Sequence, residues 1–177
     1  MSDFQLFRPR SRQLAGLDIS SSSVKLVELS GADREGCRIE RYAVEPLARD
    51  AVVDGNIANL DAVADAIKRA ARRMGSGVKN VAVALPASAV ITKRIMLPAD
   101  LREQEMEFQV ESEASQYIPF AIDEVNLDFQ VVGPSPADPD DVEVLIAASR
   151  KEKVEDRVAA AEAAGLKAVV MDVESFA

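Results

Sequence analysis

The sequence contains no histidine and only one cysteine, Cys37. Without histidine, acid–base catalysis by imidazole, Ser-His-Asp and Cys-His triads, and zinc sites of the usual His/Cys kind are excluded. A single cysteine cannot form a disulfide within the chain, which fits a reducing cytoplasm. Any catalytic chemistry must therefore rest on carboxylates, lysine, serine and a metal ion bound by oxygen atoms.

The sequence also has no excess of positive charge and no long apolar run. The chain has 21 lysines and arginines against 30 aspartates and glutamates, a net charge of −9, which argues against nucleic acid as its main partner. No apolar run approaches the ~20 residues that a membrane-spanning helix needs. Residues 1–12 mix apolar residues with three arginines, and their apolar part is too short for a signal peptide. We interpret this segment as a mobile arm, with contact to a membrane surface as the alternative.

A run of four serines lies between two predicted strands, Leu14–Ile19 and Val24–Leu29, and this pattern predicts a β-hairpin. A turn rich in hydroxyls and backbone N–H groups forms a concave anion site, to which Lys25 adds a positive charge. Asp18 lies at the end of a buried strand, where a carboxylate needs a cation or a polar partner. Together these residues are what a Mg²⁺-bound phosphate tail requires. The alternative is an ordinary serine-rich turn with Lys25 in solvent.

The rest of the chain predicts an α/β fold. With 48% hydrophobic and 29% charged residues, it has the composition of a globular protein. After the hairpin come a predicted strand at Cys37–Leu47, a helix at Asn59–Met74 and a strand at Val78–Leu85. This βββαβ order opens a ribonuclease-H-like domain, and a helix from Val154 with a strand at Leu166–Val173 continues it. The four basic residues in the last turns of the first helix indicate a solvated helix end or, less simply, a phosphate or lipid patch.

The residues between these two parts predict an inserted module with the order strand, helix, strand, strand. Asp100 and Glu103 have the spacing of a capping box, so we expect the helix to begin there and to end at Pro119. Its predicted apolar stripe is Met106, Val110, Ala114 and Tyr117, and its predicted strands are Val90–Leu97, Val125–Val132 and Val142–Ala148. The predicted boundaries are 1–12 for the arm, 13–89 and 152–177 for the host subdomain, and 90–151 for the insertion.

The residues Asp18 to Lys25 resemble the first phosphate motif of the actin-like ATPase superfamily, Asp-x-Gly-Ser/Thr-x-x-x-Lys, with Ser20 where that superfamily usually has glycine. The resemblance extends over nearly the whole chain through the segments SAVITKRIMLP, QYIPF, EVNLDF and RKEKVEDRVAAAEAAGLKAVVMDVESFA. In this order they are similar to the PilM family, the cytoplasmic actin-like proteins of type IV pilus assembly, which are related to the division protein FtsA. The resemblance implies a ribonuclease-H/actin-like subdomain 1A that carries an inserted subdomain 1C.

The resemblance also implies cofactors, ATP and Mg²⁺. In such proteins Asp18 would hold Mg²⁺ through water, and Lys25 would face the β- and γ-phosphates together with the serine turn, Ser20, Ser21, Ser22 and Ser23. Glu174 resembles the residue that orients the attacking water in relatives that hydrolyse ATP; the alternative is an acidic residue in the first turn of a helix. Because the family continues with a second domain that carries the other phosphate motif, the chain corresponds to about half of such a protein. Whether ATP is hydrolysed stays open.

The partner that the resemblance implies is the cytoplasmic N-terminal tail of the membrane protein PilN, which places the protein at the inner face of the bacterial inner membrane with indirect membrane contact. In the family this tail lies in a groove between the main subdomain and the module. The matching residues are Val90, Ile91, Thr92, Lys93 and Arg94 on a strand, and Tyr117, Pro119 and Phe120 after the helix. Two other functions compete with this scaffold: a kinase or ATPase of the same superfamily, and a filament-forming division protein of the FtsA type.

Overall fold

The computed structural model describes residues 14–31 and 36–175, so the predicted arm at 1–12 lies outside the described residues. The chain forms two compact units. Unit 1 consists of the residues up to Ala84 and of Arg157–Asp172, and unit 2 consists of Leu85–Asp156 and the residues from Val173 on. Unit 1 is therefore discontinuous in sequence.

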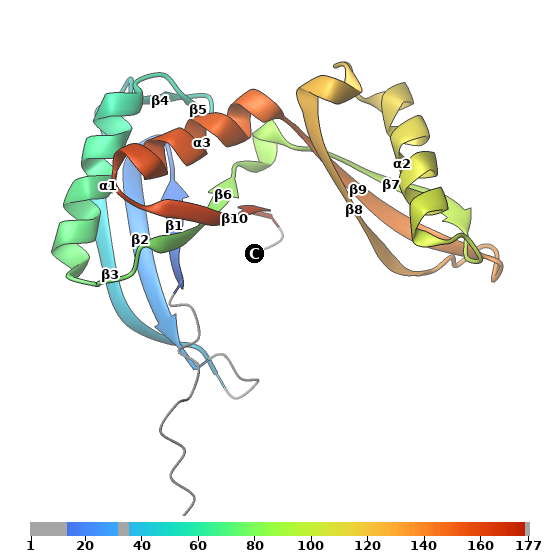
Figure 1. Cartoon of the computed structure of the whole chain (residues 1–177), viewed down its shortest axis with the longest axis horizontal. Coiled ribbons are helices and arrows are strands. Elements are labelled where there is room, and N and C mark those ends of the chain that lie inside the picture. Colours follow the sequence, from blue (N-terminus) through green and yellow to red (C-terminus); the bar gives the residue numbers. More distant parts are fainter. Residues whose placement is uncertain (1–13, 32–35, 176–177) are drawn as a thin grey trace, which may run out of the picture. The chain divides into compact units, whose positions relative to one another are not determined.

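Unit 1 is built on a five-stranded mixed sheet with the order β10-β6-β1-β2-β3 (Figure 1). The strands β1, β2 and β3 form an antiparallel meander, and β6 pairs with β1 in parallel. The bounds of the strands are Leu14–Ile19 for β1, Ser23–Ser30 for β2, Arg38–Pro46 for β3, Asn80–Leu85 for β6 and Lys167–Val173 for β10. A meander extended by strands that return through helices is the predicted α/β fold, which is thereby confirmed.

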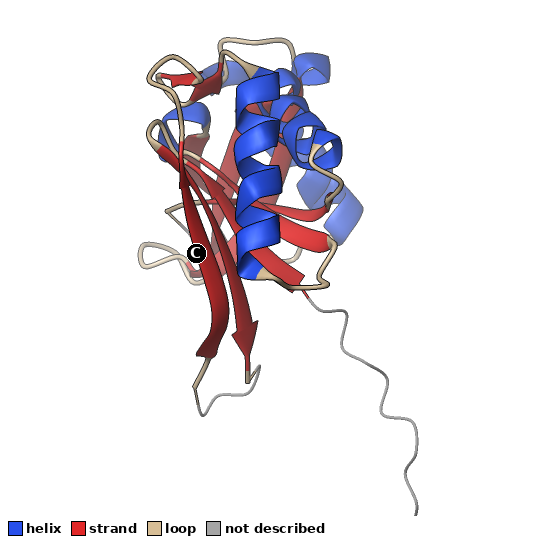
Figure 2. Cartoon of the chain, turned by 90° about the vertical axis from the view of Figure 1, so that its left-hand side faces the viewer, coloured by secondary structure: helices blue, strands red, loops and turns tan. Residues whose placement is uncertain are grey.

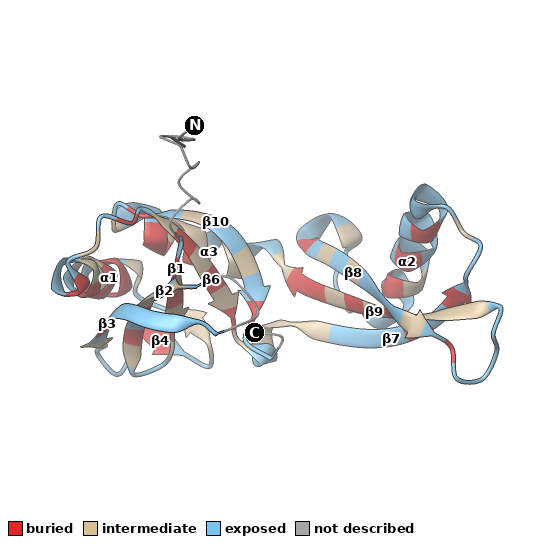
Figure 3. Ribbon diagram, turned by 90° about the horizontal axis from the view of Figure 1, so that it is seen from below, coloured by how far each residue is buried: buried red, intermediate tan, exposed pale blue. Residues whose placement is uncertain are grey.

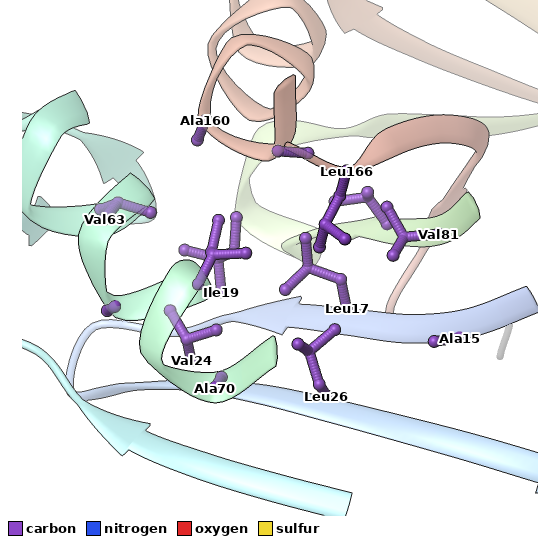
Figure 4. Close-up of a cluster of buried hydrophobic side chains, with 14 of the residues drawn as sticks. Ala15, Leu17, Ile19, Val24, Leu26, Val63, Ala70, Val81, Ala160 and Leu166 are labelled. Carbon is purple, nitrogen blue, oxygen red and sulfur yellow. The ribbon is translucent and has the colours of Figure 1, made fainter. Parts of the chain in front are cut away.

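Two helices supply the other half of the unit 1 core, α1 (Leu60–Met74) and α3 (Lys151–Ala163), which begins in unit 2. The side chain of Asn59 caps α1 by accepting the N–H of Ala62 at 3.0 Å. Gly75 ends α1 with φ 63°, a left-handed conformation that favours glycine. Figure 2 looks at the chain from the side of unit 1 and shows α1 in front of the strands of that unit. Figure 4 shows apolar side chains of both helices meeting those of β1, β2 and β6.

A two-stranded hairpin, β4 (Val52–Val53) and β5 (Asn56–Ile57), joins β3 to α1 and was not predicted. Its turn consists of Asp54 and Gly55, both with positive φ, as a tight two-residue hairpin turn requires. Arg157 of α3 is fully buried and donates a hydrogen bond from Nη2 to the carbonyl oxygen of Gly55 at 2.8 Å. This contact ties the turn to a helix that follows it by 102 residues.

Unit 2 is a three-stranded antiparallel sheet with α2 (Glu103–Tyr117) on one face (Figure 1). The strand order is β7-β9-β8, with β7 at Ile91–Pro98, β8 at Val125–Pro134 and β9 at Asp141–Arg150. Two short 3-10 turns, η1 (Ala87–Ala89) and η2 (Ile122–Glu124), precede β7 and β8. The predicted order of strand, helix, strand, strand is confirmed. Its core is formed by alternate residues of the strands and by Met106, Val110 and Ala114 of α2.

The end of α2 before Pro119 agrees with the prediction, whereas its N-cap differs from it. The helix begins one residue after Arg102, whose backbone N–H donates to the carboxylate of Glu105 at 3.0 Å, so the predicted Asp100–Glu103 capping box is wrong. At its other end α2 stops at Tyr117, because Ile118 takes an extended conformation ahead of a proline. Tyr117, the last residue of the predicted stripe, is 47% exposed, whereas the other three are buried.

Candidate functional site

The hairpin of β1 and β2 brings Asp18 and Lys25 together. The two residues are direct partners across the strands, and Lys25 Nζ donates to Asp18 Oδ2 at 2.7 Å. Because side chains alternate along a strand, the buried Leu17 and Ile19 point into the core and Asp18 points to the opposite face of the sheet. The side chain of Asp18 is 33% exposed and that of Lys25 52%, so both are accessible to a ligand from solvent.

The serine turn, Ser20 to Ser23, closes this hairpin through its own hydrogen bonds. Ser20 donates to the carbonyl oxygen of Ser23 twice, from its backbone N–H at 3.0 Å and from Oγ at 2.9 Å. The carbonyl of Ser22 accepts the N–H of Leu47 at 2.8 Å, which anchors the turn to the end of β3. Ser21 and Ser22 are exposed at the tip. Ser20 and Ser23 thus shape the turn, while the two central serines offer hydroxyls and amides to solvent.

The serine at the glycine position of the phosphate motif is not strained. Among the described residues, the only non-glycine residue with positive φ is Asp54. Ser20 therefore reaches this turn with a backbone conformation that L-residues adopt freely, and its hydroxyl adds a hydrogen bond that glycine could not make. The change from glycine to Ser20 therefore adds a hydrogen bond within the turn. The pairing of β1 with β2, which places Asp18 opposite Lys25, is regular.

The chemistry of this donor set fits a magnesium-bound phosphate group. Mg²⁺ usually keeps several waters and takes one or two carboxylates together with phosphate oxygens, so a single aspartate at the site suffices. No group of three or more carboxylate or thiol side chains able to hold a metal ion occurs in the described part of the chain. Lys25 supplies the positive charge and the exposed turn supplies N–H and O–H donors for phosphate oxygens.

Glu174 lies in the turn that follows β10 and is exposed. Its backbone N–H donates to the carbonyl oxygen of Leu85 at 3.0 Å, and the N–H of Lys167 donates to the carbonyl of Lys79 at 2.7 Å. The second bond joins the residues at the start of β6 and β10, and the first joins the residues at their ends, so β10 runs parallel to β6. In the sheet order β10 stands two places from β1.

In unit 2, β7 is an edge strand, because among the described strands it pairs only with β9. Figure 3 shows much of it in the colour of exposed residues, and Thr92, Lys93 and Arg94 are all exposed. Val90 lies just before the strand, where it closes the turn η1, and not within it as predicted. Ile91 is partly buried against the core of the module.

Two aromatic rings of unit 2 each have a cation over them, from β7 at Tyr117 and from the end of β9 at Phe120. Lys93 Nζ lies 4.5 Å from the centre of the Tyr117 ring, and Arg150 Cζ lies 5.2 Å from that of Phe120. Phe120 is 37% exposed and Pro119 is exposed, whereas Ile118 is buried in the core of the module. Arg150 was not predicted as a site residue; in the sequence it lies two residues after the predicted strand Val142–Ala148 and begins one of the segments that resemble the family.

Three of the four basic residues in the last turns of α1 pair with carboxylates of unit 1. Arg69 and Arg73 both pair with Glu45 of β3, at 3.5 Å and 3.3 Å, and Lys68 pairs with Asp65. Arg41 of β3 donates to the carbonyl of Gly75 at 2.7 Å, which satisfies a carbonyl at the helix end. These contacts favour the solvated helix end over a phosphate or lipid patch.

Comparison with known proteins agrees with the family resemblance seen in the sequence. The family model of the type IV pilus assembly protein PilM matches residues 16–177. The chain belongs to the PilM family. This PilM-family chain is 36% identical to a chain in a solved structure described as a PilM–PilN type IV pilus biogenesis complex, with a TM-score of 0.82. The match covers 95% of the present chain and 49% of that one, so the chain spans about half the length of the relative it matches.

A second solved structure shares the fold alone. It is the cytoplasmic domain of EpsL, an inner-membrane component of the type II secretion system of Vibrio cholerae, with a TM-score of 0.57 and 12% identity over 91% of this chain and 57% of that one. Within the described part of this PilM-family chain, no helix is long and apolar enough to cross a membrane.

Proposed function

We propose that this chain is part of a cytoplasmic actin-like scaffold of type IV pilus assembly, which binds ATP with Mg²⁺ and recruits the membrane protein PilN. The observation that carries the proposal is the match over 95% of the chain to a protein described in complex with PilN. Unit 1 then corresponds to subdomain 1A and unit 2 to the inserted subdomain 1C. The protein works at the inner face of the inner membrane, where its contact with the membrane is indirect.

In nucleotide binding, the residues of the β1–β2 hairpin in unit 1 have different roles. Asp18 would hold the metal, and Lys25, whose ammonium group lies beside that carboxylate, would neutralise phosphate oxygens. Ser21 and Ser22 donate to phosphate from the exposed tip, and Ser20 and Ser23 hold the turn. Glu174 orients water in any hydrolysis, a role for which its exposed carboxylate after β10 is available. The bound metal would supply charge neutralisation of the phosphate tail.

For the partner, the edge of β7 accepts the N-terminal tail of PilN as an added strand. An edge strand offers unpaired N–H and C=O groups to an extended peptide, and pockets beside it select alternate side chains of that peptide. Thr92, Lys93 and Arg94 line the edge, with Val90 and Ile91 at its beginning. The rings of Tyr117 and Phe120, with Pro119 between them, are the apolar anchors.

Fluorescence anisotropy of a labelled peptide of the PilN cytoplasmic tail tests the partner proposal in the natural full-length protein. Saturable binding is expected, and a scrambled peptide of the same composition should not bind. If the authentic tail fails to bind a folded protein, the recruitment proposal is wrong.

Titration calorimetry with Mg-ATP tests the nucleotide proposal. The full-length protein should bind, whereas residues 1–177 alone should bind weakly or not at all, because only one phosphate motif is present. Clear saturable binding by residues 1–177 would contradict the second expectation, and no binding by the full-length protein would contradict the first.

A further inference from the structure

The Asp18–Lys25 ion pair has a consequence for how a metal and a phosphate group enter the hairpin. Lys25 Nζ contacts Asp18 Oδ2 at 2.7 Å, so the ammonium group already neutralises the carboxylate that a divalent cation would need. Both groups are on the face of the sheet opposite α1, and the cross-strand register holds them opposite each other. A ligand therefore meets a neutralised pair at this point of the hairpin.

We propose, on the basis of the nucleotide function proposed above, that this ion pair is an exchange device that makes nucleotide binding depend on the metal. Asp18 gives up Lys25 for a hydrated divalent cation, and Lys25 turns to the phosphate oxygens in the same event. Each charged group then keeps an opposite charge beside it throughout. Without the metal, Lys25 can reach phosphate only by leaving Asp18 as an uncompensated carboxylate next to a polyanion.

The exposure of the two side chains makes such an exchange feasible. With 52% of Lys25 and 33% of Asp18 exposed, the pair lies in a region of high dielectric constant, where an ion pair adds little to stability. Breaking it costs little, and a divalent cation competes well for the carboxylate. Lys25 has a flexible four-carbon stem whose ammonium group can move while its backbone stays paired on both sides, with Asp18 in β1 and Val44 in β3.

The serine turn supports the exchange because its own hydrogen bonds hold its conformation. Ser20 fixes both its N–H and its hydroxyl on the carbonyl of Ser23, and the carbonyl of Ser22 is held by the N–H of Leu47. The turn that receives phosphate is therefore formed before a ligand arrives. Only the two charged side chains need to change partners.

The exchange predicts an unusual behaviour of Asp18→Asn. Asparagine keeps the size of the side chain but removes the negative charge, so Lys25 becomes available to phosphate without a metal. Metal-free ATP should bind this variant about tenfold more tightly than the wild type, because one like charge beside the polyanion is gone. In the presence of Mg²⁺ the same variant should bind more weakly than the wild type. A residue with a merely structural role would shift both affinities in the same direction.

The experiment measures the affinity of a fluorescent ATP analogue for the full-length protein, once with Mg²⁺ and once with EDTA. The variants are Asp18→Asn, Lys25→Met and the double variant, and the matched control is Asp65→Asn, which removes the exposed pair with Lys68 on α1. Lys25→Met and the double variant should lose metal-free binding, and Asp65→Asn should behave as the wild type. Circular dichroism checks that each variant is folded.

Two failures can be told apart. If Asp18→Asn weakens binding equally with and without Mg²⁺, the exchange is wrong and the nucleotide function stands. If the wild-type protein binds the analogue under neither condition, the nucleotide function is wrong and the exchange falls with it.

Discussion

The two helices α1 and α2 are both 15 residues long, and both carry an apolar stripe, yet the stripes end differently. In α1 the last residue of the stripe, Met74, is 8% exposed and packs against the unit 1 core. In α2 the last residue, Tyr117, is 47% exposed and carries the ammonium group of Lys93 over its ring. The apolar stripe of α2 therefore runs past the core of its own unit and leaves the Tyr117 ring partly in solvent.

The caps of the two helices differ in the same way. α1 is held by a neutral amide, Asn59, and by Gly75 in a left-handed conformation, both of which are independent of pH. α2 is held at its start by the carboxylate of Glu105 and has no glycine at its end. Both helices bury one face, but α1 is capped at both ends by groups that do not titrate, whereas α2 has a charged start and no glycine cap at its end. Four experiments test this contrast.

The largest effect is expected in the core of unit 1. Ile67 of α1 is fully buried, so Ile67→Ala should lower the free energy of unfolding by about 3 kcal/mol through lost burial and a cavity. Tyr117→Ala at the end of α2 should cost less than about 1 kcal/mol, because half of that side chain is already in solvent. Urea denaturation followed by circular dichroism measures both. Equal losses would mean that Tyr117 is packed as a core residue.

The next effect concerns binding at the end of α2. Aromatic anchors dominate many interfaces, so Phe120→Ala should weaken binding of the PilN tail by about 2 kcal/mol, roughly 30-fold. Tyr42→Ala is the matched control, since Tyr42 is an exposed aromatic residue of unit 1 at 71% exposure. Anisotropy with the labelled tail gives both affinities. Phe120 would be removed from the site if the folded variant bound as tightly as the wild type.

A smaller effect is expected at the end of α1. Gly75 has φ 63°, which costs a residue with a side chain about 1 kcal/mol, so Gly75→Ala should lower stability by about that amount. Gly77→Ala is the control, because a Cβ there meets no atom within 4 Å and the backbone is not left-handed. It should stay within about 0.5 kcal/mol of the wild type. A larger loss for Gly77→Ala would show that the linker after α1, and not its cap, is sensitive.

The smallest effect is a pH dependence at the start of α2. Hydrogen bonds from the side chain and the backbone N–H of Arg102 lower the pKa of Glu105 below its ordinary value. A lowered pKa in the folded state contributes stability above the unfolded pKa of about 4.3, and this stability is lost as the pH falls through the folded pKa. Unit 2 should therefore weaken in acid, and Glu105→Gln should remove part of this dependence. Urea denaturation of both proteins from pH 6 to pH 3 measures the difference, and parallel curves would contradict it.

Local signals in the sequence were enough for most elements. The amide of Asn59 and the glycine at position 75 bracket α1 as predicted, since a cap needs only a side chain of the right kind at the right place. The cap of α2 was predicted wrongly because two residue pairs, Asp100–Glu103 and Arg102–Glu105, share the same spacing. Spacing alone cannot distinguish them, and the backbone conformation before the helix decides. The hairpin at Asp54–Gly55 was missed although that dipeptide is a strong turn signal, because its strands have only two residues each.

The sequence predicted which residues belong to the candidate site, and the structure added which of them contact one another. The sequence identified Asp18, Lys25 and the serines, but their pairing depends on the register of the hairpin, which the hydrogen bonds of Ser20 fix. The cation over the Phe120 ring comes from Arg150, thirty positions along the chain, and no local pattern links the two. Contacts between distant residues follow from strand order, which a single sequence does not reveal. The roles of these residues in binding stay predictions.

The buried Arg157 and the carbonyl of Gly55 are separated by 102 residues, and unit 2 lies in the sequence between them. As the chain leaves the ribosome, β6 has only β1 beside it until β10 has been made, and its other edge stays unpaired during that time. Unit 2 is almost continuous and can fold during this interval, whereas unit 1 must close a long loop before its core is complete. An unpaired inner strand is a template for wrong pairing between chains. The insertion therefore delays the completion of the unit 1 sheet, which includes the β1–β2 hairpin, until β10 has been made.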